Sequence, residues 1–347
     1  MGKHTDTFHY SEPFALESGS TLPGFQLAYT TVGTLNENRT NVIWVCHALT
    51  GSSDFTDWWA DLFNADGPFR PDRYFIVCAN VLGGCYGSTG PLSVNPETSA
   101  PYYHDFPLIT NRDAVRAFDL LRQHLGISGI HTVIGGSLGG QQVLEWAIHK
   151  PEMFEHIIPI ACNAFHSPWG IAFNEAQRLA IEADPSWKNN DARAGFEGLK
   201  AARAIAMLSY RQYGSYGRTQ SETETGHLDN YRAASYQRYQ GEKLTRRFNA
   251  FTYWTLSKMM DNHHIGRGRT NTIAALKQIK SKALVIGIDT DILFPVAEQE
   301  FLAEHISSAE LRVATSHYGH DGFLVEYGQL KKFVEHFYKN SVRTITI

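Results

Sequence analysis

The sequence predicts an α/β protein in which helices cover both faces of a mostly parallel β-sheet. The first observation is a series of short, nearly continuous apolar runs, which suit strands that are buried on both sides. The second is that helical patterns separate these runs, as in doubly wound folds. The apolar runs occupy residues 42–46, 74–79, 131–134, 157–162, 283–288 and 310–314.

The clearest helix between two of these runs covers residues 111–125. Its apolar residues fall on one stripe, and Gly126 follows at the position where helices commonly end. An amphipathic pattern at 141–149 directly follows one apolar run, and a further helical pattern around 329–338 closes the chain. These helices are placed to cover the sheet.

A long segment without strand-like runs interrupts the alternation. Residues 166–269 contain helical stretches at 172–183, 196–210 and 245–260, and strand-like runs resume afterwards. One sheet with an insertion explains this order better than two separate domains. We therefore expect an α/β core built from residues 1–165 and 270–347, with residues 166–269 forming a helical lid.

Composition excludes several classes of protein. The 347 residues carry 31 Lys and Arg against 35 Asp and Glu, a net charge of −4, so no basic excess favours nucleic acid or a membrane surface. The four cysteines form no C-x-x-C pair, and no stretch approaches the ~20 apolar residues of a membrane helix. The polar N-terminus lacks the apolar core of a signal peptide. We expect a cytoplasmic protein.

One motif carries chemistry. Residues 135–139, Gly-Gly-Ser-Leu-Gly, match G-x-S-x-G, with a strand pattern directly before the motif and a helix pattern directly after it. Such a strained strand-to-helix turn lifts the serine hydroxyl to the carboxyl edge of the sheet, beside the free N–H groups of the helix. This context favours a nucleophilic Ser137 over an incidental serine.

A serine nucleophile needs a base, and the base needs an orienting acid. In hydrolase-like α/β folds the chain order is serine, acid, histidine. Asp291 and His320 follow the two last predicted strands and fit this order, with Asp289 and His317 as the competing acid and base. The motif thus predicts a triad of Ser137, Asp291 and His320.

The oxyanion of an acyl-transfer intermediate needs two N–H donors. We expect the N–H of Leu138, next to the nucleophile, to be one of them. The loop 47–51, after the first predicted core strand, offers the other, and Leu49 is the best candidate.

Three other features do not predict a site. The glycine-rich residues 83–90 lack the lysine of a phosphate-binding loop and lead into proline. Cys85 has no basic neighbour in the sequence, so we expect an unreactive thiol. His263 and His264 are adjacent and lack the spacing of metal ligands, so we expect no metal.

Motifs along nearly the whole chain resemble the homoserine O-acyltransferases of the α/β-hydrolase superfamily. The string from Asn80 to Pro91, NVLGGCYGSTGP, and the string from Tyr318 to Asp321, YGHD, are specific to that family, whereas G-x-S-x-G marks only the superfamily. Further matches lie at residues 47–51, 135–140 with 144–146, 171–175 with 177–178, 239–241, 266–269 and 287–291 with 294–295.

The resemblance implies an α/β-hydrolase fold and the same triad of Ser137, Asp291 and His320. It also implies that Arg203 and Asp321 bind the substrate. Homoserine is a zwitterion, so its carboxylate suits a guanidinium and its ammonium suits a carboxylate. Without the resemblance, Arg203 would be interpreted as a solvated helix residue.

The activity implied is ping-pong transfer of an acetyl group from acetyl-CoA, as co-substrate, to homoserine, a step towards methionine. No other cofactor is implied, and family members are generally dimers through the lid helices. Alternatives are a succinyl donor, a serine acceptor, an esterase or thioesterase, and a non-catalytic binding protein on the same scaffold.

Overall fold

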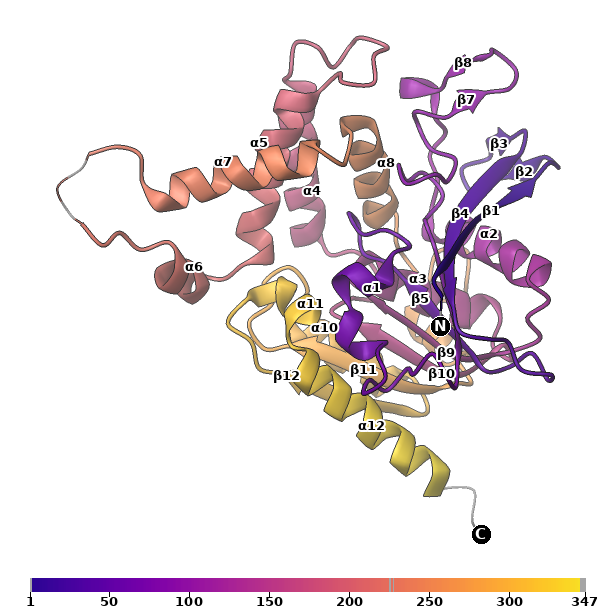
Figure 1. The fold of residues 1–347 in the computed structure, drawn as a ribbon. Coiled ribbons are helices and arrows are strands. Elements are labelled where there is room, and N and C mark those ends of the chain that lie inside the picture. The colour runs from indigo at the N-terminus through magenta and orange to yellow at the C-terminus, as the bar shows by residue number, and fades with distance from the viewer. Residues whose placement is uncertain (1, 225, 227, 344–347) are drawn as a thin grey trace.

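The computed structural model describes residues 2–224, 226 and 228–343, and eight of its strands form one central sheet. Figure 1 shows this sheet in the middle of the molecule. In spatial order its strands are β1 (His4–Tyr10), β4 (Phe25–Val32), β6 (Phe75–Ala79), β5 (Val42–Cys46), β9 (Ile130–Gly136), β10 (Phe154–Ile160), β11 (Lys282–Ile288) and β12 (Ala309–Ala314). Two small antiparallel pairs lie outside the sheet: β2 (Phe14–Ala15) with β3 (Thr21–Leu22), and β7 (Val94–Asn95) with β8 (Ala100–Pro101).

The sheet is mostly parallel, as predicted. All pairings from β6 through β12 are parallel, whereas β1 and β4 are antiparallel at one edge. Neither strand was predicted. β1 is mostly exposed and polar and gives no apolar run, whereas β4 is almost entirely buried but includes polar Gln26, Thr30 and Thr31, which interrupt its apolar pattern. The predicted strand 157–162 was displaced: β10 spans residues 154–160, and the chain leaves the sheet after Ile160.

Both faces of the sheet are buried, which explains the continuous apolar runs. In β5, Val42, Trp44 and Cys46 belong to one apolar cluster, and the alternate residues Ile43 and Val45 belong to a second cluster. This alternation follows from the two-residue period of a strand. The core therefore consists of two layers of side chains, one on each side of the sheet.

Helices cover these two layers (Figure 1). Apolar residues of α2 (Asn111–His124), α3 (Leu138–His149) and α10 (Val296–His305) join the first cluster, and those of α1 (Phe55–Trp58) and α12 (Tyr327–Arg343) join the second. Thr110 and Asp113 form a capping box at the start of α2, and Gly126 follows its end with a φ of +66°. The shorter elements are η1 (Ala60–Leu62), η2 (Tyr103–Asp105), α9 (Thr272–Leu276), η3 (Gly319–Asp321) and α11 (Gly322–Val325).

Between β10 and β11 the chain forms a group of helices: α4 (Pro168–Glu182), α5 (Phe196–Tyr210), α6 (Tyr213–Thr219), α7 (Arg232–Thr245) and α8 (Ala250–Asp261). α5 packs on α4, α7 and α8, and Tyr216 of α6 contacts Tyr236 of α7. The prediction of one helix at 245–260 was wrong. α7 ends at Thr245, and α8 begins only after Asn249, whose side chain accepts a hydrogen bond from the Thr252 N–H. An asparagine cap of this kind starts a new helix.

The predicted boundaries of the core (1–165 and 270–347) and the lid (166–269) cover the whole chain, but residues 1, 225, 227 and 344–347 lie outside the described residues. Within the described part, the helices α4 to α8 lie inside the segment 166–269, and all eight strands of the sheet lie outside it. Among the described helices, none combines the length and the apolar character that crossing a membrane requires.

Candidate active site

Ser137 lies in the sharp turn between β9 and α3. The strand ends at Gly136, the helix begins at Leu138, and Ser137 itself has a φ of +57°. A positive φ is strained for a residue with a side chain, and such strain collects at functional sites. The turn is held by the Ser137 N–H, which donates to the Ile160 carbonyl at 2.9 Å.

The glycines around Ser137 are required by close packing. A Cβ at Gly139 would lie 2.1 Å from the Cys46 carbonyl oxygen, and one at Gly135 would lie 2.5 Å from the Gly139 carbonyl carbon. Only glycine lets α3 approach β5 and β9 this closely. The G-x-S-x-G pattern therefore reflects a packing constraint that fixes where the serine stands.

His320 and Asp291 are paired. His320 lies in η3, after β12, and its Nδ1 is 2.6 Å from Oδ2 of Asp291. The other carboxylate oxygen of Asp291 accepts hydrogen bonds from the N–H groups of Leu293 and Phe294, at 2.8 and 2.9 Å. Both side chains of the pair are buried. A buried carboxylate fixed in this way orients the imidazole and leaves its Nε2 for chemistry.

The competing acid and base have other partners. Oδ1 of Asp289 accepts the N–H of Ser316 at 2.9 Å, so this carboxylate holds the loop after β12. His317 is exposed, and its Nδ1 lies 3.2 Å from Nη2 of Arg218. Geometry therefore separates residues that the sequence left as alternatives.

One narrow cavity of about 60 Å³ brings most of the predicted site residues together. Its lining includes Leu49, Ser137, Arg203, His320 and Asp321, and it is completed by Ala48, Thr50, Tyr210, Phe323 and Leu324. The N–H groups of Leu49 and Leu138 donate no hydrogen bond within the described residues, so both donors are available for an oxyanion. A nucleophile, a base and a cation thus share one cavity.

Comparison with known proteins identifies the family. Residues 41–327 match the alpha/beta hydrolase fold family. A homoserine O-acetyltransferase from Cyclobacterium marinum is 54% identical over 96% of this chain and 95% of its own length. This chain belongs to the homoserine O-acetyltransferase family.

Solved structures agree with this family. The homoserine O-acetyltransferase from Bacillus anthracis superposes with a TM-score of 0.88 at 25% identity, covering 96% of this chain and 97% of that one. Esterase E22, carrying an L374D substitution, has a TM-score of 0.89 at 24% identity, covering 97% of this chain and 99% of that one, and shows that the fold is shared with esterases.

Arg203 extends from α5 into the cavity. Its guanidinium lies 5.3 Å from the centre of the Tyr210 ring and has no ion-pair or hydrogen-bond partner among the described residues. The aromatic face holds the guanidinium in place while its N–H donors stay free. A free cation beside the nucleophile suits a ligand carboxylate, as the family resemblance implied.

Asp321 already has a partner. Nε of Arg211 lies 3.0 Å from its Oδ2, and burial raises the pKa of the Asp321 carboxyl while the positive charges of Arg211 and Arg203 oppose this. The sequence did not single out Arg211, because it follows the end of α5 and meets Asp321 only through tertiary packing. An ammonium that binds Asp321 would share this carboxylate with Arg211.

A second carboxyl group, that of Glu298, lies near the triad acid Asp291. Oε2 of Glu298, in α10, accepts a hydrogen bond from Nδ2 of Asn163 at 3.0 Å. Burial and, to a smaller extent, the nearby negative charge of Asp291 raise the pKa of Glu298 to about 7, although the hydrogen bond from Asn163 opposes the shift. Glu298 was not predicted, because nothing in the local sequence indicates its proximity to Asp291.

Two features that the sequence had set aside are now explained. Burial raises the pKa of the Cys85 thiol to about 11, so the thiol is unreactive as expected. The stated reason was wrong, however, because Arg247 lies close enough to oppose that shift. His263 is buried and its Nε2 lies 2.9 Å from the Asn163 carbonyl oxygen, so it serves as an internal hydrogen-bonding group.

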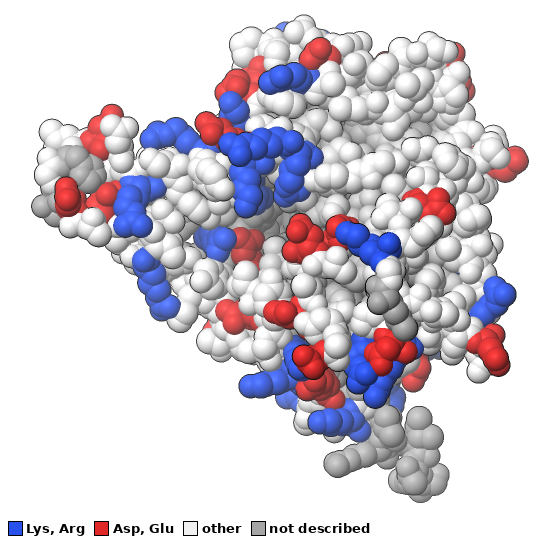
Figure 2. Space-filling model, in the orientation of Figure 1, with Lys and Arg blue, Asp and Glu red and all other residues white. Residues whose placement is uncertain are grey.

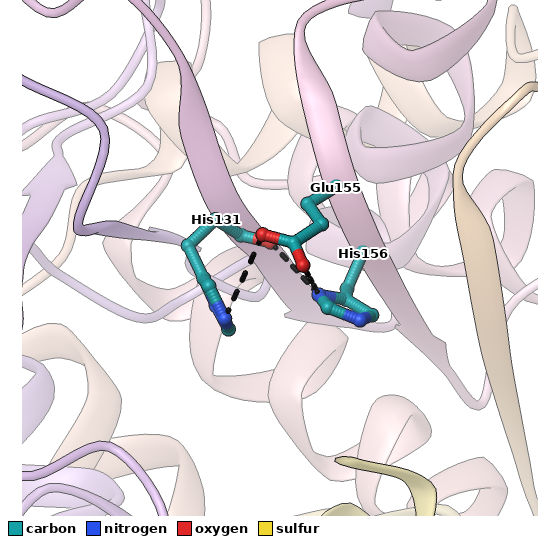
Figure 3. Close-up of side chains that lie close together, drawn as sticks. All are labelled: His131, Glu155 and His156. Atoms are coloured by element: carbon teal, nitrogen blue, oxygen red, sulfur yellow. Dashed lines mark hydrogen bonds and ion pairs between the residues drawn. The ribbon is translucent and has the colours of Figure 1, made fainter. Parts of the chain in front are cut away.

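The structure also gathers His131, Glu155 and His156 (Figure 3), a set that could in principle hold a metal ion. Glu155 oxygens lie 3.9 Å from Nε2 of His131 and 4.0 Å from Nδ1 of His156. Both rings pack on Tyr338, and burial lowers the pKa of both, that of His131 to about 4. Packing accounts for this cluster, which lies at the amino ends of β9 and β10, opposite Ser137. Glu155 and His156 are adjacent in the sequence, but only the pairing of β9 with β10 brings His131 to them, so the sequence did not reveal the cluster.

Proposed function

We propose that this protein transfers an acetyl group from acetyl-CoA to the γ-hydroxyl of L-homoserine. The observation that carries the proposal is the shared cavity, in which the unpaired guanidinium of Arg203 stands beside Ser137 and His320. Membership of the homoserine O-acetyltransferase family supports the donor and the acceptor. The product, O-acetyl-L-homoserine, is an activated intermediate towards methionine.

In the first half-reaction His320 takes the proton of the Ser137 hydroxyl, and the oxygen attacks the thioester carbonyl. The N–H groups of Leu49 and Leu138 stabilise the oxyanion. The carbon–sulfur bond then breaks, the departing thiolate takes the proton from His320, and an acetyl ester remains on Ser137. Asp291 stabilises the imidazolium at the intermediate stage.

In the second half-reaction homoserine replaces CoA. Arg203 binds its carboxylate and Asp321 its ammonium, which brings the γ-hydroxyl towards the acetyl-serine. His320 takes the hydroxyl proton, the new carbon–oxygen bond forms, and the bond to Ser137 breaks as the serine regains its proton. A narrow cavity that orients the acceptor favours transfer over hydrolysis, because water lacks the two charged groups.

The decisive experiment follows free thiol release from acetyl-CoA with and without L-homoserine, with mass spectrometry of the product. We expect release to depend on homoserine and to yield its O-acetyl ester. Equal rates without an acceptor would identify a thioesterase instead. Parallel reactions with succinyl-CoA and with L-serine test the alternative donor and acceptor.

A burst experiment tests the nucleophile. Without acceptor, the wild-type enzyme should release one thiol per active site in a rapid phase, and Ser137→Ala should lose this phase. Ser128→Ala, at an exposed position in the loop before β9, is the matched control and should keep it. A burst retained by Ser137→Ala would exclude Ser137 as the nucleophile.

We also propose a homodimer formed through the inserted helices. Leu179, Leu208 and Tyr213 are exposed large side chains of α4, α5 and α6, with exposed fractions of 56%, 54% and 94%. Burial of such side chains favours association. Light scattering coupled to size exclusion should give twice the chain mass, and a monomer would contradict this proposal.

A cytoplasmic location completes the proposal. All four cysteines are free thiols, which suits a reducing compartment. Fractionation of cells that express the protein, with antibody detection, should recover it in the cytoplasmic fraction.

A further inference from the structure

The cavity at Ser137 is too small for a whole acyl-CoA. Its volume of about 60 Å³ is far below the ~300–1,000 Å³ of pockets that enclose a drug-sized ligand. It can hold the acyl group and the thioester, so the nucleotide end of the donor must lie outside it. That end carries several phosphate charges, and a cationic surface at the rim would bind them.

Arg247 lies next to Thr50, at the edge of this cavity. It lies between α7 and α8, and its Nη1 donates to the Thr50 carbonyl oxygen at 2.6 Å and also to the hydroxyl of Tyr86. Thr50 lines the same cavity as Ser137. The Nε and Nη2 groups of Arg247 make no hydrogen bond within the described part of the chain, so they can bind an anion at the cavity mouth.

Two further cations, Lys243 and Arg246, lie close to Arg247 in the chain. Lys243 precedes Arg246 by one helical turn, and both side chains are exposed and have no ion-pair partner among the residues described. Figure 2 shows Lys and Arg side chains gathered over the junction of α7 and α8. The whole chain has a net charge of −4, so this positive group is a local feature.

We propose that Lys243, Arg246 and Arg247 form a binding site for the phosphate groups at the nucleotide end of the acyl-CoA donor. Arg247 lies between the sites for the two ends of the donor, because its Nη1 holds the loop that carries Leu49, while its Nε and Nη2 have no hydrogen-bond partner among the described residues and the residue is exposed. This inference rests on the proposed function, since it assumes an acyl-CoA donor. According to this inference, residues at the end of α7 and in the α7–α8 connection make the enzyme prefer donors that carry the CoA phosphates.

The test compares acetyl-CoA with acetyl-pantetheine, a donor that lacks the nucleotide and all its phosphates. The wild-type enzyme should prefer acetyl-CoA in kcat/KM. In the double variant Lys243→Gln/Arg246→Gln this preference should fall by about tenfold or more, since charge-assisted hydrogen bonds to phosphate are lost. Arg247→Gln should also reduce it, and Arg247→Lys should restore part of it. Added salt should weaken acetyl-CoA use more than acetyl-pantetheine use in the wild type, and this difference should be smaller in the double variant, which keeps only Arg247.

Arg73→Gln is the control, because Arg73 is exposed at the amino end of β6, away from the cavity. It should keep the wild-type preference. An unchanged preference in the double variant, or a wild-type enzyme that uses both donors equally, would overturn the inference.

The proposed function could be wrong while the phosphate site exists, and the enzyme would then consume no acyl-CoA in the presence of homoserine. In that case the phosphate site can still be tested by calorimetric titration of the protein with CoA. Weaker binding to the double variant than to the wild type would support the rim site, and equal or absent binding would refute it.

Discussion

The α/β core and the inserted helices contribute different kinds of groups to the cavity. Core groups are fixed by several contacts: Asp291 accepts two backbone N–H groups and binds His320, and Ser137 lies in a turn that glycine packing dictates. The insertion contributes cations with free donors, Arg203 and Arg247. This difference indicates that the core performs the chemistry, and that the cations of the insertion, together with Asp321 of the core, select the substrates.

Breaking the triad should produce the largest effect. Asp291→Asn keeps the oxygen that accepts the N–H groups of Leu293 and Phe294, but it places an NH₂ group against Nδ1 of His320. His320 then carries its proton on Nε2 and cannot accept the proton of Ser137 there. We expect kcat to fall by about 10⁴-fold with little change in stability. Asp289→Asn is the matched control, since an amide oxygen can still accept the Ser316 N–H. Steady-state kinetics of both variants separates the two acids, and equal losses would refute this assignment.

A substitution at Gly139, in the turn that carries Ser137, tests whether close packing fixes this part of the core. At Gly139 a methyl group would meet the Cys46 carbonyl oxygen at 2.1 Å, a backbone atom that cannot rotate away. We expect Gly139→Ala to lose about 3 kcal/mol or more of unfolding free energy. At Gly328, in α12, an added Cβ meets nothing within 4 Å. Gly328→Ala should therefore be neutral or slightly stabilising in the same denaturant titration, and a similar loss in both variants would contradict the packing argument.

The core also explains what could be predicted from the sequence. Parallel strands buried on both faces give apolar runs, and the packing of α3 on β5 demands glycines, so both leave local patterns. The choice between Asp289 and Asp291 was not local, because both follow the same strand, and only the position of His320 separates them.

The insertion was much less predictable. Arg203 was singled out only by resemblance to a family. Arg211 and Arg247 were missed because their partners, Asp321 for Arg211 and Thr50 and Tyr86 for Arg247, are distant in the sequence. The boundary between α7 and α8 depended on the Asn249 cap, which the apolar pattern of the flanking residues concealed. Residues that recognise ligands from connections between helices therefore leave little signal in a single sequence.

Arg203 tests the role of the insertion. Arg203→Gln should raise the KM for homoserine and lower acceptor kcat/KM by about 50-fold, because a charge-assisted pair with the carboxylate is lost. The burst of thiol release from acetyl-CoA should persist. Arg193→Gln is the matched control, since Arg193 lies at the same 5.3 Å from a ring, that of Phe196, but outside the cavity. If the burst and the acceptor step fall together, the division between chemistry and selection is wrong.

The smallest effect concerns His47, at the start of the loop that carries Leu49. Its Nε2 accepts the Val81 N–H at 3.0 Å, and its Nδ1 donates to the Ala48 carbonyl at 2.8 Å, so the neutral ring satisfies both contacts. Burial lowers the pKa of His47 to about 4, below its ordinary value near 6.5. The unfolded chain therefore takes up this proton first as the pH falls, and the stability that the neutral ring contributes is present above about pH 6.5 and is lost towards pH 4.

When the pH is lowered from 7 to 5, the shifted pKa of His47 should lower the unfolding free energy of the wild type by about 1–2 kcal/mol. His47→Gln should be less stable than the wild type at pH 7 but should lose less on acidification, so that the gap narrows. The exposed His9→Gln is the control and should keep the wild-type slope. Denaturant titrations at the two pH values measure the gap. A constant gap would mean that the loop beside the oxyanion donors does not depend on a neutral His47, and that the core holds this part of the site by packing alone.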